Sequence, residues 1–144
     1  MPYTYDYPRP MVTVDIVLLT AARKVLLIQR KNEPFKDQWA LPGGFVDMQE
    51  TVEEAAHREL EEETGLKNIH MEQMQVFSSP GRDPRGRTIS VVFTGFLKGA
   101  EIPPRAGDDA RNAAWVAMDE LPGLAFDHTE IINFAKQKYI KNIE

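Results

Sequence analysis

The stretch of sequence that decides the fold is ETVEEAAHRELEEETGL, residues 50–66. Thr51 is followed three residues later by Glu54, a capping-box pattern that marks the start of a helix. At about 100° per residue, one stripe of that helix collects its apolar side chains. These are Val52, Ala55, Ala56, Leu60 and, if the turn continues, Leu66. The sequence therefore predicts a helix over residues 51–64 with one buried stripe.

The same count places acidic side chains inside that stripe. Glu59 and Glu63 fall in its middle and Glu62 at its edge, whereas Glu54 and Glu61 lie on the far side. An acidic run is usually a solvated helix face, but such a face does not put carboxylates between alanines that pack on a sheet. Because clustered, partly desolvated carboxylates repel one another, these acids predict a positive partner inside the fold.

Two kinds of positive partner are considered, an arginine and a metal ion. Arg58 is adjacent to the acids, but one guanidinium does not neutralise three carboxylates from one side. Magnesium takes oxygen ligands and keeps positions open for substrate phosphates. The preceding residues 42–44, Pro-Gly-Gly, let backbone groups approach a ligand closely because glycine has no β-carbon. The acids and the glycines together favour a Mg²⁺ site.

The rest of the chain interleaves strand-like and helix-like segments. Strands are predicted over residues 12–20, 24–29, 69–77, 88–97 and 113–118. Short apolar pieces at 39–41 and 45–46 flank a sharp turn expected at 42–44. A second helix is expected over 128–140. This order predicts one mixed α/β domain whose helices pack against a sheet.

The composition is that of one globular domain, residues 1–144, with 42% hydrophobic and 27% charged side chains. The absence of cysteine excludes disulfide scaffolds, thiolate zinc sites and cysteine nucleophiles, and it fits a reducing compartment. With 17 basic and 22 acidic residues, duplex DNA is disfavoured as a partner. No apolar run approaches the ~18 residues of a membrane span, and no signal-peptide pattern begins the chain. We therefore expect a cytoplasmic protein with neither nucleic-acid nor membrane partners.

Taken together, these residues resemble a Nudix box. Gly44 is followed after five residues by Glu50 and, after seven more, by RELEEETGL at 58–66, so that the pattern is filled over 23 residues. Segments outside the box that also resemble the family are residues 26–30, 39–44, 107–110 and 115–116. The resemblance covers about residues 12–139. It implies a Nudix-type α/β/α sandwich with a mixed β-sheet and a catalytic loop–helix–loop, preceded by an N-terminal leader at 1–10.

The resemblance implies metal-dependent hydrolysis of a nucleoside diphosphate linked to another group. Such a reaction needs neutralised phosphate charge and a hydroxide-like nucleophile, which carboxylate-held cations supply. The ligands implied for Mg²⁺ or Mn²⁺ are the backbone carbonyl of Gly44 and the carboxylates of Glu59, Glu62 and Glu63. Arg58 is then expected to orient the cluster as part of the catalytic machinery, and Glu50 to brace the loop–helix–loop.

The sequence offers two candidate locations for the general base. Family members carry it either on the box helix, where Glu62 would serve, or on the loop before the late strand. In that loop, residues 101–112, Asp109 lies six residues before Trp115, and Asp108 is its alternative. Asp109 is a candidate both for base and for metal ligand, although paired aspartates in loops more often serve turns.

Substrate preference is carried by residues outside the box. Pro80, about 15 residues beyond it, resembles a proline typical of ADP-ribose pyrophosphatases, and residues 81–90 resemble a stretch of ADP-ribose-hydrolysing members and Nudix-derived regulators. A guanidinium binds oxyanions bidentately, so the arginines of this loop suit a diphosphate. The residues expected to contact substrate are Arg30, Arg82, Arg87 and Trp39, with Trp39 and Phe35 as candidates for stacking on adenine. Asp127 is expected to cap the last helix, and His128 is given no binding role.

Three functions are compatible with these residues. The leading hypothesis is an ADP-ribose diphosphatase that produces AMP and ribose 5-phosphate. The second is clean-up of oxidised or non-standard nucleoside triphosphates, against which the arginine-containing loop argues. The third is a non-catalytic ADP-ribose sensor, which the intact box and the net charge of −5 disfavour. The sequence leaves the exact substrate open, and the chain is expected to be a monomer or a homodimer.

Overall fold

A computed structural model describes residues 2–99, 101–107 and 110–143. The strands are β1 (Met11–Thr20), β2 (Lys24–Arg30), β3 (Trp39–Ala40), β4 (Gly43–Phe45), β5 (Glu72–Phe77), β6 (Thr88–Leu97) and β7 (Ala110–Ala117). The helices are α1 (Val52–Thr64), the short 3-10 helix η1 (Met118–Glu120) and α2 (His128–Ile143). None of the helices in the described ranges combines the length and the apolarity that crossing a bilayer requires.

The strands form one mixed sheet with β1 at its centre. β1 pairs in parallel with β6 along its whole length, from Met11 opposite Thr88 to Thr20 opposite Leu97. The main strand order is β3-β2-β1-β6-β5, with β4 added on β1 and β7 added on β2. All of these other pairings are antiparallel. The expectation of a mixed sheet is therefore confirmed.

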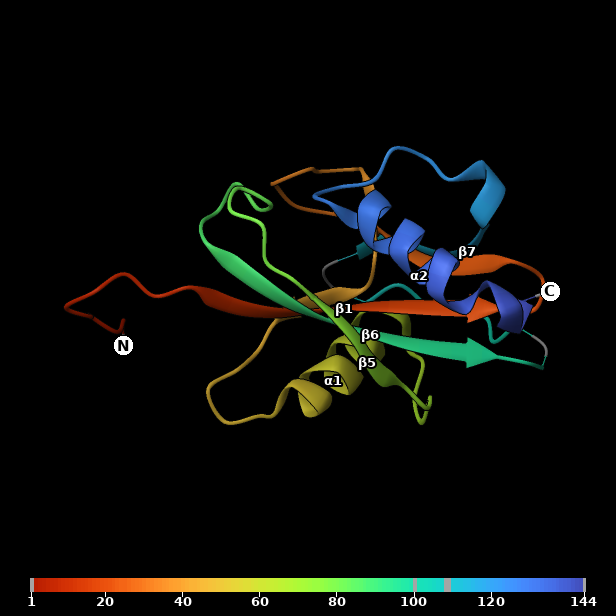
Figure 1. Ribbon diagram of the computed structural model, residues 1–144, viewed down its shortest axis with the longest axis horizontal. Coiled ribbons are helices and arrows are strands. Elements are labelled where there is room, and N and C mark those ends of the chain that lie inside the picture. Colours follow the sequence, from red (N-terminus) through yellow and green to blue (C-terminus); the bar gives the residue numbers. More distant parts are fainter. Residues whose placement is uncertain (1, 100, 108–109, 144) are drawn as a thin grey trace.

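The two long helices cover opposite faces of this sheet (Figure 1). Alternate side chains of a strand point to opposite faces, so β1 contributes to two cores. Val14, Ile16 and Leu18 pack with α1, whereas Val17 and Leu19 pack with α2. Each fully buried aliphatic side chain of this kind contributes roughly 1.5–3 kcal/mol of transfer free energy. These two cores make the α/β/α sandwich that the sequence predicts.

The helix α1 begins and ends at residues that its sequence marks. Thr51 Oγ1 accepts a hydrogen bond from Glu54 N at 3.1 Å, and the Glu54 carboxylate accepts one from Thr51 N at 3.0 Å. Gly65 ends the helix in a left-handed conformation with φ of 76°, which glycine adopts without a steric penalty. The predicted capping box is confirmed, and Ala55 and Ala56 are buried as expected.

Three strands differ from the sequence-based expectation by more than one residue, and one of them, β5, begins at Glu72, three residues after its predicted start. Residues 43–44 were expected only as a sharp turn, but they lie in β4, where Asp15 is opposite Gly43. A β-carbon at Gly43 would overlap the Val14 carbonyl oxygen, so the close pairing with β1 requires glycine. The strand β7 begins at Ala110, three residues before the predicted start, because it pairs with β2 as far as Arg30.

Candidate active site

A cavity of about 400 Å³ opens where α1, β4 and the segment leading into α2 meet. Its lining combines carboxylates, glycine backbone, guanidinium groups and aromatic rings. Among the lining residues are Gly44, Glu59, Glu63, Arg82, Arg85 and Phe126. A pocket with both acidic and basic side chains can hold a cation and a phosphate together. Glu59 and Glu63, which the helical count places on the buried side of α1, both line this cavity.

The acid pair of α1 is partly desolvated. Glu63 is only 7% exposed, and one of its carboxylate oxygens accepts a hydrogen bond from Gly43 N at 3.0 Å. Burial raises the pKa of Glu63 well above its ordinary value, and the nearby charge of Glu59 raises it further. Burial also raises the pKa of Glu59, against the opposing effect of Arg58. A positive charge between the oxygens of Glu59 and Glu63 would reduce the repulsion between the two carboxylates.

The backbone of β4 lies directly against these acids. A β-carbon at Gly44 would overlap the carboxylate of Glu59, so only glycine leaves room for both groups. This close approach brings the β4 backbone and the α1 carboxylates to one place in the cavity. Oxygen donors from a helix and from an adjacent strand are thus available to the same ligand.

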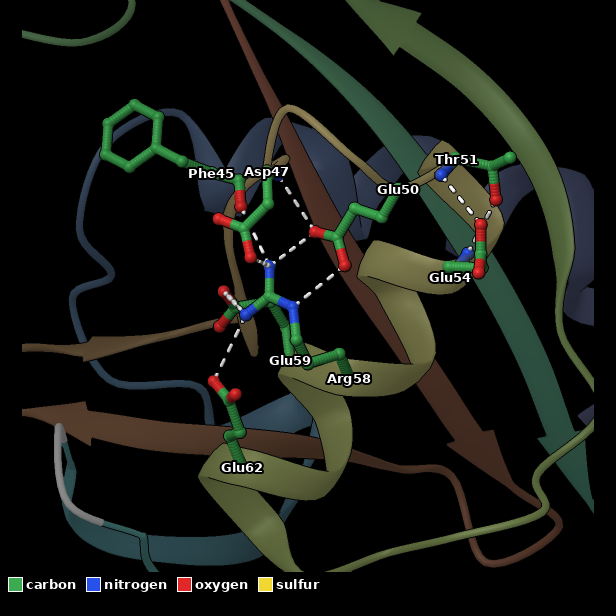
Figure 2. Close-up of polar contacts among 8 residues, drawn as sticks. All are labelled: Phe45, Asp47, Glu50, Thr51, Glu54, Arg58, Glu59 and Glu62. Carbon is green, nitrogen blue, oxygen red and sulfur yellow. Dashed lines mark hydrogen bonds and ion pairs between the residues drawn. The ribbon is translucent and has the colours of Figure 1, made fainter. Parts of the chain in front are cut away.

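Arg58 binds several acids on the other side of the cluster (Figure 2). Its Nε donates to Glu50 Oε2 at 3.0 Å and its Nη2 to Glu50 Oε1 at 2.6 Å. Its Nη1 donates to Glu59 at 2.9 Å and to Glu62 at 3.2 Å. The bidentate contact lowers the pKa of Glu50 to about 2. Arg58 and Glu50 therefore tie the loop after β4 to the helix.

The remaining predicted residues fall into two groups. Arg30 and Arg82 line the cavity, whereas Phe35 does not line it and packs edge-on against the Phe126 ring. Glu62, Trp39 and Arg87 do not line the cavity. The side chain of Glu62 is 56% exposed and is bound by Arg58, and Trp39 packs with the core under α2. Arg87 is exposed, and its guanidinium donates to the Thr88 carbonyl. Asp108 and Asp109 lie outside the described residues.

A buried polar network beneath the cavity was not predicted. Asp15 of β1 accepts a hydrogen bond from Ser90 Oγ at 2.6 Å and lies 3.3 Å from His128 Nε2. Burial alone would raise the pKa of Asp15, but His128, Ser90 and Arg82 together hold it below the ordinary value. Both oxygens of Asp127, expected to cap α2, accept from Arg82, at 2.7 and 2.9 Å. The network joins β1, β6 and the start of α2.

His128 has a defined tautomer within this network. Its Nδ1 accepts a hydrogen bond from Leu41 N at 3.0 Å, which leaves Nε2 to carry the proton and donate to Asp15. His128 thus positions both the chain before β4 and the start of α2. The one signal in the sequence was Asp15 itself, the single charged residue of a mostly apolar strand.

The donor chemistry of the site fits a hard divalent cation. Two carboxylates with raised pKa values lie against a glycine backbone. Among residues 2–99, 101–107 and 110–143, no three acidic or histidine side chains already converge as metal ligands. Glu59 and Glu62 are held by Arg58, and Glu63 is held by Gly43.

Comparison with known proteins gives a family match and several similar proteins. The NUDIX domain family model matches residues 9–135. A curated ADP-ribose pyrophosphatase of Methanocaldococcus jannaschii is 52% identical over 126 residues, covering 88% of this chain and 73% of that protein. The ADPR responsive transcriptional repressor NtrR of Acinetobacter baylyi is 34% identical over 137 residues, covering 90% of this chain but only 54% of the repressor.

A solved structure agrees at the level of the fold. The NUDIX domain of Shewanella oneidensis NrtR, in a cocrystal structure with ADP ribose, superposes with a TM-score of 0.84 at 32% identity. The match covers 93% of each chain. With this agreement, and with the family model spanning residues 9–135, the chain belongs to the NUDIX domain family.

Proposed function

We propose that this chain is a cation-dependent pyrophosphohydrolase that converts ADP-ribose and water into AMP and ribose 5-phosphate. The observation that carries the proposal is the buried pair Glu59 and Glu63, packed on Gly44 in a cavity that also holds arginines. The similarity to an ADP-ribose pyrophosphatase and to a NUDIX domain cocrystallised with ADP ribose supports the choice of substrate.

The acids would hold the cation, with Mg²⁺ proposed first and Mn²⁺ as its alternative. The match to the NUDIX domain family and the buried acid pair together support a divalent cation. The ligands would be Glu59, Glu62, Glu63 and the carbonyl of Gly44. When bound, the cation neutralises phosphate charge and makes a water molecule more acidic. Arg58, braced by Glu50, contacts both Glu59 in the cavity and the exposed Glu62, so Glu62 would have to turn toward the cation when it binds.

The reaction replaces one bond of the diphosphate. A water oxygen bonds to one phosphorus, the bond from that phosphorus to the bridging oxygen breaks, and the bridging oxygen leaves on the other phosphate. The water proton would go to Glu62, or to Asp109 or Asp108 of the loop before β7. Gly107 N donates to the Glu63 carbonyl at 3.1 Å, so this loop approaches the end of α1 just before those aspartates.

The acids can be tested by two isosteric substitutions. We expect Glu59→Gln and Glu63→Gln each to lower ADP-ribose turnover by roughly 100-fold or more, since losing even an outer partner of a metal ligand costs about 10- to 100-fold. Glu61→Gln, on the exposed face of the same helix, is the matched control. Wild-type turnover in the two variants at saturating Mg²⁺ would contradict the proposal.

A substrate panel separates the alternatives. We expect ADP-ribose to be hydrolysed with a higher kcat/KM than oxidised or non-standard nucleoside triphosphates. The opposite ranking would favour the clean-up function, and tight ADP-ribose binding without turnover would favour a sensor, as the similarity to a transcriptional repressor suggests. A cytoplasmic location, the absence of a nucleic-acid partner and a monomeric or homodimeric state stay predictions.

A further inference from the structure

Three flat side chains line the cavity and have no part in the chemistry just proposed. The guanidinium carbon of Arg85 lies 4.7 Å from the ring centroid of Phe45 and 5.3 Å from that of Phe126. They come from β4, from the loop before β6 and from the segment before α2, so the fold brings distant parts of the chain together. Figure 2 shows the Phe45 ring directed away from the carboxylates around Arg58.

The charge of Arg85 is already matched by another side chain. Its Nε donates to Asp83 Oδ1 at 3.0 Å and its Nη2 to Asp83 Oδ2 at 2.8 Å. Asp83 is itself only 5% exposed, so this ion pair is fixed in place. A guanidinium bound in this way offers a ligand its flat face more readily than its charge.

Phe126 is held in an unusual backbone conformation. Its φ is +52°, in the left-handed region that a bulky residue rarely occupies. The neighbouring Ala125 N donates to the Trp39 carbonyl at 2.9 Å, and the Phe35 ring packs edge-on at 4.8 Å from the Phe126 ring. The surroundings therefore impose the direction in which this ring faces, as is common at ligand sites.

We propose that Phe45, Arg85 and Phe126 form the subsite for the nucleobase of the substrate. This rests on the proposed function, because it assumes a nucleotide substrate at the acid pair. Aromatic rings and guanidinium planes stack on any base, whereas ribose has no flat face and a phosphate would require unmatched positive charge. The assignment moves base recognition from Trp39, which packs in the core under α2, to the cavity itself.

The test measures binding of the two products, AMP and ribose 5-phosphate, by calorimetry with Mg²⁺ present. We expect Phe126→Leu and Phe45→Leu to weaken AMP binding roughly 5- to 100-fold, the effect of losing one base–aromatic stack. Ribose 5-phosphate, which lacks the base, should bind the variants and the wild type equally. Tyr7→Leu is the control, since this tyrosine is 79% exposed and lies outside the cavity.

Each outcome decides the assignment. Unchanged AMP binding in both variants, or equal weakening of both products, would overturn the subsite. If Phe126→Leu loses its cooperative thermal transition, Phe45→Leu decides alone, because the 36% exposed Phe45 ring is not part of a core. If the wild-type protein binds AMP and the two variants bind it more weakly, but ADP-ribose is not hydrolysed, the proposed function is wrong and the nucleobase subsite is still supported.

Discussion

At Glu63 the proposed role as a metal ligand opposes the stability of the folded protein. Its carboxylate is 7% exposed and receives one backbone hydrogen bond, from Gly43. The neighbouring Glu59 adds a like charge. Without a cation, the ionised form of Glu63 is therefore unfavourable in the folded protein but not in the unfolded chain.

This difference predicts a pH-dependent effect of Glu63→Gln on stability. The folded-state pKa of Glu63 lies above its ordinary value of 4.5, so the folded state binds the proton more tightly than the unfolded state does. Cation-free wild type should therefore lose stability as pH rises from about that value through the raised pKa, and Glu63→Gln should not. We expect the variant to be the more stable protein at neutral pH, by roughly 1–3 kcal/mol, and the advantage to vanish near pH 4.

Urea denaturation at several pH values, with a chelator present, measures this difference. Glu61→Gln serves as the exposed control on the same helix. An advantage of Glu63→Gln that grew toward low pH would contradict the assignment of the raised pKa.

The acids of α1 were predictable because a helix has a fixed period, so 17 residues of sequence suffice to place Glu59 and Glu63 on the buried side. The network of Asp15 was not. Its partner Ser90 lies 75 positions away in the sequence, and no local pattern connects the two. Phe45 and Phe126 were missed for the same reason, since only the folded chain brings both into the cavity.

The ion pair between Arg82 and Asp127 links the loop before β6 to the start of α2. The Arg82 side chain is 4% exposed, and its Nη2 also lies 3.6 Å from Asp15. We expect Arg82→Ala to destabilise the protein by about 3–5 kcal/mol, because the partly buried Asp127 loses both of its bonds from Arg82 and the buried Asp15 loses a nearby positive charge. Arg87→Ala, in the same loop but exposed, should change stability by no more than about 0.5 kcal/mol.

Thermal unfolding of the two arginine variants checks this expectation. Similar melting temperatures would mean that the Arg82 ion pair does not hold the two elements together. A rise in KM for ADP-ribose in Arg82→Ala then has to be compared with the loss of stability before it is assigned to substrate contact.

Elements were predicted best where the pattern is local. The helix α1 and the strands β1 and β6 have clear periodicity or long apolar runs, and all three are found. The strand β4 was missed because glycine has no strand propensity of its own, and only its pairing with β1 makes it extended. The early start of β7 likewise depends on β2, not on its own residues.

The whole molecule should be stabilised by the cation that its site is proposed to hold. Ligand binding to the folded state alone adds about 2.7 kcal/mol at a free concentration 100 times the dissociation constant. We therefore expect Mg²⁺ to raise the melting temperature of the wild type by several degrees, and to have a much smaller effect on Glu63→Gln. Calorimetric scans with Mg²⁺, and again after chelation, measure the shift. Equal shifts in both proteins would place the bound Mg²⁺ elsewhere.

The parallel pairing of β1 with β6 affects the order in which the protein folds during its synthesis. The segment that carries α1 lies between these two strands in the sequence, so it emerges well before β6 can complete the centre of the sheet. The strands β1 and β4, which pack against α1, both precede it in the sequence, and it is β4 that contacts Glu63 and Glu59 through Gly43 and Gly44. We therefore expect the acid pair to acquire its preference for a cation from the first half of the chain, before the sheet is complete.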